Sequence, residues 1–540
     1  MTPTPVPDPD SPHDDAAPDS ILNFRQWWRS PKSWKCGTLS YTRPKLAILF
    51  FWLLWGDVCY VLMESVTPGI MPLKLHDLGA PDWILGMMMT TISGGITFFL
   101  NPVISFKSDR FRSRWGRRIP FIVGSAPLLV ACLVLIAFGD RVGFWAHDHL
   151  GFLSHYSPNT IAVAVLGFAL AMFTFFNTFV TSVFWYLFND VVPEHLLARF
   201  MSWFRVVSTA TSAGYGFFIF GHARTHFTEI FVGAALLYFV GFLLMCLNVK
   251  EGEYPPPPEN IDRKPGRLGE LKTYGKECFS LSHYRYQYII TFLGSVSGGI
   301  GMFGVFMSLG LGLTLQQTGT IGATMNVTVA VLILISGWLA DRYHPIRVVM
   351  AGVFAHLVIA TPLSFIWFFW HTTPVNVFHY SLAVNILVTA PLAALSGVWD
   401  PPLFMRYFPR DRYGQFCSAN AMCRAAGSIV GGALAGVYLA TVGRYLCPLD
   451  ALHRACGPFV GGVTTVVDAD TLSRFSGHYS QYYFIPFWQL AFSIPGVFLI
   501  VKMYRSWKKH GGDASYIPPL PAGDVKDAMS GPKWESETPA

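Results

Sequence analysis

The sequence predicts an all-α membrane protein with twelve transmembrane helices arranged in two pseudo-symmetric six-helix bundles. Three observations indicate this fold class. The 540 residues are 52% hydrophobic and only 13% charged, and they include 45 phenylalanines and 17 tryptophans. A single soluble core cannot bury so much apolar surface. The chain also contains twelve long apolar windows, and basic residues gather in alternate loops between them.

Each window is long enough to cross a bilayer. A span needs about 20 mostly apolar residues, because a helix rises 1.5 Å per residue and the hydrocarbon is roughly 30 Å thick. Helices are expected because backbone polar groups facing lipid must be satisfied within the segment. The windows are residues 46–71, 83–106, 119–139, 159–188, 200–221, 227–249, 287–312, 319–340, 346–370, 377–399, 414–441 and 480–503.

The loop charges predict the orientation of the spans. Lysine and arginine concentrate in residues 25–45, 110–118, 250–285, 341–347, 406–412 and 502–509, whereas the intervening loops carry few. Under the positive-inside rule the basic loops and both termini are cytoplasmic. The pattern has no periplasmic domain and no organelle-targeting signal, which favours a bacterial inner membrane.

A proline-rich and charge-rich segment divides the chain into two halves. The run "EGEYPPPPENIDRKPGR" at 251–267 cannot span a membrane, and six windows lie on each side of it. The predicted organisation is a cytoplasmic tail (1–43, disordered and then basic and aromatic), a bundle (44–249), a linker (250–285), a bundle (286–505) and a tail (506–540).

A charged motif follows the second span of each half. The first, "SDRFRSRWGRRIPF" at 108–121, places five arginines in nine residues, and "SGWLADRYHPIR" at 336–347 occupies the equivalent place in the second half. The pair resembles the signature of the major facilitator superfamily. The first motif, with "VTP" at 66–68, "LGAP" at 78–81 and "ISGG" at 92–95, is similar to the sucrose–proton symporters and the related glycoside–pentoside–hexuronide cation symporters.

The resemblance implies a sugar carrier that works by alternating access. An aspartate in such a motif can accept hydrogen bonds from arginines and from a helix N-terminus, which would latch the two halves together. A latch of a few kcal/mol leaves both access states populated. The expected gate residues are Asp109, Arg110, Gly116, Arg117, Arg118, Gly337, Asp341 and Arg342.

Four charged residues fall inside the spans, where each costs at least about 2.5–3.5 kcal/mol on insertion scales. Asp57 and Glu64 share one face of the first span and are the expected proton-coupling groups. Arg205 in the fifth span and Arg424 in the eleventh are expected to form ion pairs within the membrane. The alternative is that all four are permanent ion pairs that fix helix packing and never titrate.

The fourth span departs from the family pattern. Sucrose carriers place a key acid there, whereas this chain has the phenylalanine-rich run "AMFTFFNTF" at 171–179. The resemblance therefore implies either that coupling has moved to the first span or that the protein is a facilitator.

Sugar recognition requires neutral hydrogen-bonding groups and aromatic faces in a cavity, bordered in this superfamily mainly by spans 1, 4, 7 and 10. Any of these side chains can instead join neighbouring helices or anchor the membrane interface. The expected substrate-binding residues are Asn177, Thr181, Trp185, Asn385, Thr389 and Asn420, with Asn326 as a weaker candidate.

Other features narrow the function. No phosphate-binding loop, nucleophile elbow or metal-ligand spacing is visible, so neither an enzyme nor a metal site is expected. No cofactor is expected, and the coupling ion is a proton, with sodium as the alternative. The expected partners are a small-molecule sugar and membrane lipid but no nucleic acid, and the expected state is a monomer. Cys447 and Cys456 could form a disulfide in the last outer loop. A facilitator or exporter of another small solute, or a non-transporting sensor, remains the alternative function.

Overall fold

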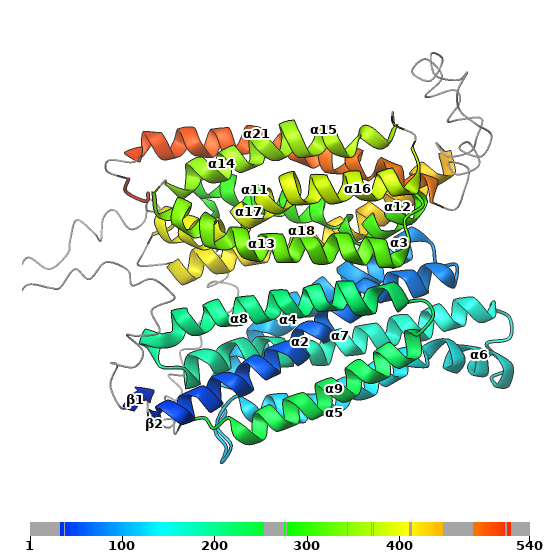
Figure 1. The fold of residues 1–540 in the computed structure, drawn as a ribbon, viewed down its shortest axis with the longest axis horizontal. Helices are drawn as coiled ribbons and strands as arrows, with labels where there is room; N and C mark the ends of the chain where they lie inside the picture. Colours follow the sequence, from blue (N-terminus) through cyan, green and yellow to red (C-terminus); the bar gives the residue numbers. More distant parts are fainter. Residues whose placement is uncertain are drawn as a thin grey trace, which may run out of the picture.

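The computed structural model describes residues 33–36, 38–252, 275, 278–342, 344–368, 370, 372–409, 413–445, 479–512 and 516–519. These residues are almost entirely helical, and Figure 1 shows two groups of long helices lying side by side, one from each half of the chain. Ten of the described helices are long and apolar enough to cross a membrane. The predicted all-helical, two-bundle membrane fold is confirmed. Cys447 and Cys456 lie outside the described residues.

Within the described part of the first half, the chain forms six helical spans. They are α2 (Arg43–Asp77); α3 (Asp82–Gly86) continued by η1 (Met87–Ile92) and α4 (Ser93–Arg110); α5 (Ile119–Ala137); α7 (Pro158–Val191); α8 (Glu194–Gly214) continued by η2 (Tyr215–Ile219) and η3 (Phe220–His222); and α9 (Phe227–Asn248).

The described part of the second half repeats this pattern with six more. They are α11 (Ser282–Gly298) with η4 (Gly301–Phe303) and α12 (Gly304–Gly310); α13 (Leu315–Arg342); α14 (Pro345–Ala355) with η5 (His356–Ala360), α15 (Thr361–Ser364) and η6 (Ile366–Phe368); α16 (Pro374–Val384) with η7 (Asn385–Thr389) and α17 (Ala390–Tyr407); α18 (Tyr413–Tyr445); and η9 (Ser480–Phe484) with α21 (Ile485–Lys509).

Two elements lie outside the predicted spans. Strands β1 (Ser33–Cys36) and β2 (Leu39–Thr42) form an antiparallel hairpin, in which Trp34 pairs with Tyr41. The hairpin includes the end of the tail segment that the sequence analysis treated only as basic and aromatic. Helix α6 (Gly139–His149) occupies the loop before α7. In Figure 1 the hairpin and α6 lie at opposite ends of the bundles, which are called here the hairpin end and the α6 end.

The two halves contact each other at the α6 end. Asp82, at the start of α3, accepts hydrogen bonds from the Tyr482 hydroxyl (2.6 Å) and the Gln481 amide (3.1 Å) in η9. The ring of His76 stacks on that of Tyr479, with 5.5 Å between their centroids. Arg224 pairs with Asp77 and also donates to the Tyr479 hydroxyl at 3.2 Å. Hydrogen bonds and ring stacking therefore join the halves at this end.

Glycines bring the helices of the two halves close together. A Cβ added to Gly86 would lie 2.1 Å from the carbonyl oxygen of Gly432 in α18, and one added to Gly319 would lie 2.3 Å from that of Gly216. Small residues let backbones approach closely in membranes, where association depends on packing rather than on the hydrophobic effect. The contact between the halves therefore depends on positions that tolerate no side chain.

We predict that Gly86→Ala lowers the thermal stability of the purified protein, because the new methyl group would clash with Gly432 and overpacking costs about 1–3 kcal/mol. Gly95→Ala is the matched control, since a Cβ at Gly95 has nothing within 4 Å. Thermal unfolding in detergent should show a lower Tm for the first variant only. Equal melting temperatures for the two variants would contradict the close contact.

Candidate functional site

One face of α2 carries the polar residues Asp57, Tyr60, Glu64 and Thr67 at helical spacing. Asp57 is fully buried, and its Oδ2 accepts a hydrogen bond of 2.6 Å from the Ser208 hydroxyl on α8. Its Oδ1 has no hydrogen-bond partner among the described residues. The carboxyl that the sequence analysis selected for proton coupling is therefore buried with a single neutral donor.

The two predicted arginines differ from the acids in exposure. Arg205 lies one turn before Ser208, the α8 residue that donates to Asp57. No described carboxylate lies within 4 Å of Arg205, which is exposed. Arg424 is likewise exposed on α18. The ion pair expected for Arg205 is therefore not formed among the described residues.

Glu64, the second intramembrane acid of α2, contacts a residue predicted to bind substrate. Asn177 on α7 donates a hydrogen bond from its amide to Glu64 Oε1. One turn further along α7, Thr181 accepts a hydrogen bond of 3.4 Å from the Tyr60 hydroxyl. The structure therefore brings together Glu64, Asn177 and Thr181.

These residues line a cavity of about 290 Å³ within the first bundle. Most of the residues that line it are serines, threonines and asparagines from α2, α4 and α7, and apolar side chains such as Phe173 and Met89 complete the lining. The Ser182 hydroxyl donates to Asn101 Oδ1 at 2.6 Å. The sequence analysis missed Asn101 and Ser182, although an amide in the apolar second span was a usable signal. The polar residues of the lining include Glu64, Thr67, Asn101, Asn177, Thr181 and Ser182.

The other predicted substrate residues lie elsewhere. Trp185 is 39% exposed and its ring packs edge-on against Phe204. Asn420 is buried against α11, where its Oδ1 accepts from the Thr291 hydroxyl at 2.8 Å. Thr389 lines a separate cavity of about 370 Å³ in the second bundle.

Asn385 and Asn326, the other two predicted amides of the second half, each contact a neighbouring helix. Asn385 points its amide at the carbonyl oxygen of Ile321 at 3.4 Å. Asn326 donates to the Ser212 hydroxyl at 3.1 Å and so joins the second half to the first. The predicted substrate residues of the second half therefore do not share the cavity of the first bundle.

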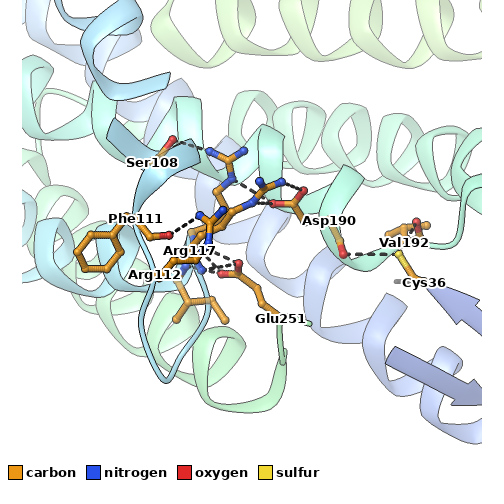
Figure 2. A network of polar contacts seen from close by, with 10 residues as sticks. Cys36, Ser108, Phe111, Arg112, Arg117, Asp190, Val192 and Glu251 are labelled. Atoms are coloured by element: carbon orange, nitrogen blue, oxygen red, sulfur yellow. Dashed lines mark hydrogen bonds and ion pairs between the residues drawn. The ribbon is translucent and has the colours of Figure 1, made fainter. Parts of the chain in front are cut away.

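The arginine motif forms an ionic network at the hairpin end, which Figure 2 shows. Arg117 and Arg118 both pair with Asp190 at the end of α7, through contacts of 2.9 and 3.1 Å from their Nε atoms to Oδ2. Arg118 is 5% exposed, donates to the Ser108 hydroxyl and lies over the Tyr186 ring at 4.9 Å. The side chains of Asp109, Arg110, Asp341 and Arg342 lie outside what the structure describes, as does the surrounding of Gly337.

A second carboxylate caps the helix that follows the motif. The Glu251 oxygens accept hydrogen bonds from the backbone N–H groups of Arg117, Arg118 and Ile119 at 2.9, 2.8 and 2.6 Å. These N–H groups lie at the start of α5 and have no carbonyl partner within the helix. Negative charge is favourable at a helix N-terminus, so the Glu251 carboxylate suits this position. Gly116 has a φ of +99°, and a Cβ there would lie 2.5 Å from Glu251, so only glycine fits.

Sequence reasoning missed Asp190 and Glu251 because both lie at the ends of apolar windows, where charges usually mark only the membrane boundary. The hairpin also contacts this network, since the Cys36 thiol donates to the carbonyl oxygens of Asp190 (3.5 Å) and Val192 (3.6 Å). Burial, and then the negative charge of Asp190, raises the pKa of the Cys36 thiol. The thiol therefore keeps the proton that it donates.

Two helical bundles, intramembrane acids and an ionic network between spans define a transporter of the two-bundle class. The family model of the Major Facilitator Superfamily matches residues 59–432, and the chain belongs to this family. It is therefore a transport protein rather than an enzyme.

Individual relatives match over shorter stretches. The sucrose transport protein SUC4 of Arabidopsis thaliana is 30% identical over 107 residues, which are 20% of this chain and 19% of that protein. Solute carrier family 45 member 4 of Homo sapiens is 24% identical over 262 residues, 45% of this chain and 32% of the relative. The matched regions thus span about a third or less of these relatives.

Solved structures share the fold over most of the chain. A D-xylose–proton symporter superposes with a TM-score of 0.52 at 14% identity, covering 86% of this chain and 97% of the other. The nucleoside transporter NupG gives 0.53 at 13% identity, with 85% and 99% covered.

We predict that Asp190→Asn strongly destabilises the protein, because it removes the negative charge that Arg117 and the buried Arg118 both contact. Breaking a buried pair in this way costs about 3–5 kcal/mol. Asp148→Asn on α6 is the control, because the Asp148 side chain is 67% exposed. Thermal unfolding measures both variants, and a Tm for Asp190→Asn equal to that of the control would refute the structural role of the network.

Proposed function

We propose that this transporter carries a sugar, a disaccharide or a glycoside, by alternating access coupled to protons. The observation that supports this most directly is the cavity of about 290 Å³ in the first bundle, with its lining of amides, hydroxyls and one carboxyl. The likeness to a sucrose transport protein agrees with the proposal.

The chemistry of the lining suits a neutral polyhydroxylated solute. Asn101, Asn177, Thr181 and Ser182 offer both donors and acceptors. Among the described residues that line the cavity, Glu64 alone carries a charged side chain. Partly desolvated groups of this kind favour a ligand that completes their hydrogen bonds and reject an apolar analogue that leaves them unpaired. An anionic solute would meet no lysine or arginine among the described residues of this lining.

The two intramembrane acids of α2, Asp57 and Glu64, are the proposed proton carriers, with Asp57 first. An ionised carboxylate that is fully buried with one donor is costly, and protonation removes that cost. Glu64 contacts Asn177, which lines the cavity, so a proton on this acid changes the hydrogen bonds available to a sugar. This arrangement links proton binding to substrate binding through a direct contact.

The conformation agrees with one access state of such a cycle. The bonds of Asp82 and Arg224 with η9 and Tyr479 hold the halves together at the α6 end. Ser212 on α8 contacts Asn326 of the other half. Arg205 lies on the same face of α8, nearer the hairpin end, and its side chain is exposed there. We therefore propose that the substrate path opens at the hairpin end and that this end faces the cytoplasm.

Uptake of radiolabelled sucrose, maltose and related sugars into vesicles containing the purified protein tests the substrate. We expect uptake of at least one of them to exceed that of empty vesicles and to rise when a proton gradient, acid outside, is imposed. Equal uptake with and without the gradient would leave a sugar facilitator. Failure of every sugar, under conditions where the protein is folded, would contradict the sugar proposal.

We predict that Asp57→Asn, and more weakly Glu64→Gln, reduces gradient-driven accumulation by about tenfold or more, which corresponds to roughly 1.4 kcal/mol of lost coupling. Exchange of sugar at equal concentrations should survive in Asp57→Asn, because it needs no net proton movement. Comparison of the two assays separates coupling from binding. Unchanged accumulation in both variants would show that these acids carry no coupling proton.

A further inference from the structure

A second cavity lies at the hairpin end, between α5 and α9, apart from the proposed transport site. Its volume is about 440 Å³, and its lining includes Arg114, Trp115, Val123, Leu243, Leu247 and Lys250. These residues combine two cations, an indole and aliphatic side chains. Such a combination suits a ligand with an anionic part and an apolar part.

The two cations of this groove lack the partners that the neighbouring arginines have. Arg117 and Arg118 both form ion pairs with Asp190. Arg114 and Lys250 are exposed, and neither has a described carboxylate within 4 Å. Glu251 also lines the groove, but its oxygens accept hydrogen bonds from the N-terminus of α5. Two positive charges are therefore available to an anion.

The aliphatic side of the groove continues into the surface that faces the bilayer. Leu236, Val240, Leu243 and Leu247 follow one face of α9 and are 62%, 43%, 39% and 66% exposed. The opposite face of α9 is buried in the bundle, through residues such as Tyr238, Phe242 and Met245. Trp115 is 62% exposed beside the two cations, a position typical of an indole at the membrane–water interface.

We propose that this groove binds an anionic glycerophospholipid, with its phosphodiester between Arg114 and Lys250 and one acyl chain along Leu243 and Leu247. A membrane lipid accounts for the site better than a soluble phosphate does, because the cations adjoin a continuous lipid-facing apolar stripe. The lipid headgroup lies next to the Gly116 turn and the Glu251 cap. Its occupancy therefore braces the loop that carries the arginine network.

Native mass spectrometry of the delipidated full-length protein, titrated with phosphatidylglycerol or with phosphatidylcholine, tests the proposal. We expect one phosphatidylglycerol to bind more tightly than any phosphatidylcholine. Each cation contributes about fivefold in affinity, so Arg114→Gln with Lys250→Gln should weaken that binding by about 25-fold. The control is Lys502→Gln with Arg505→Gln, which removes the same charge from exposed positions near the hairpin end of α21.

A photo-crosslinkable phosphatidylglycerol on the unmodified protein provides a second measurement that does not depend on variants folding. Crosslinks should map to residues 111–123 and 240–250, and excess glycerol phosphate should not compete. Equal affinity for the two lipids, equal weakening in the control variant, crosslinks confined to other spans, or full competition by glycerol phosphate would each overturn the proposal.

Discussion

The cost of placing a charge in hydrocarbon is the constraint on which this structure depends. Three of the described acids within or beside the spans contact a second segment of the chain. Asp190 joins α7 to the loop before α5, Asp82 joins α3 to η9, and Asp57 joins α2 to α8. Each carboxylate therefore also determines which elements pack together.

The partners of these acids separate structural roles from proton-carrying roles. Asp190 faces two arginines, so protonating it would remove the negative charge that both of them contact. Asp57 and Glu64 have neutral hydrogen-bond donors instead, Ser208 and Asn177. These two acids can lose their charge without leaving a cation within 4 Å of them unpaired. On this physical ground, the acids of α2 suit proton coupling and the acid of α7 suits the scaffold.

The halves of the molecule meet through different chemistry at different depths. At the α6 end, Asp82 and glycine pairs such as Gly86 and Gly432 give a close contact with few mobile side chains. Deeper in the bundles, a hydrogen bond between Asn326 and Ser212 joins α13 to α8. A contact built from a few hydrogen bonds and glycine packing can open at a cost comparable to the binding energy of a small solute. Alternating access requires such a balance.

Hydropathy and loop charge sufficed to predict the helical spans and the division into halves, because lipid imposes one strong periodic requirement on the chain. Helical spacing also predicts that Asp57 and Glu64 share one face of α2 and that Asn177 and Thr181 share one face of α7. Spacing shows which face a residue occupies but not which neighbour that face meets. Asn420 therefore contacts Thr291 inside the second bundle, and the cavity next to Asn177 lies within the first bundle.

The hairpin and the roles of Asp190 and Glu251 depend on long-range contacts, and four-residue strands are too short for a reliable sequence pattern.

Proton coupling through Asp57 and Glu64 is tested most directly by measuring proton movement that sugar induces. Sugar added to weakly buffered vesicles should produce a transient rise in external pH that disappears in Asp57→Asn while sugar binding remains. An undiminished pH rise in that variant would contradict the account.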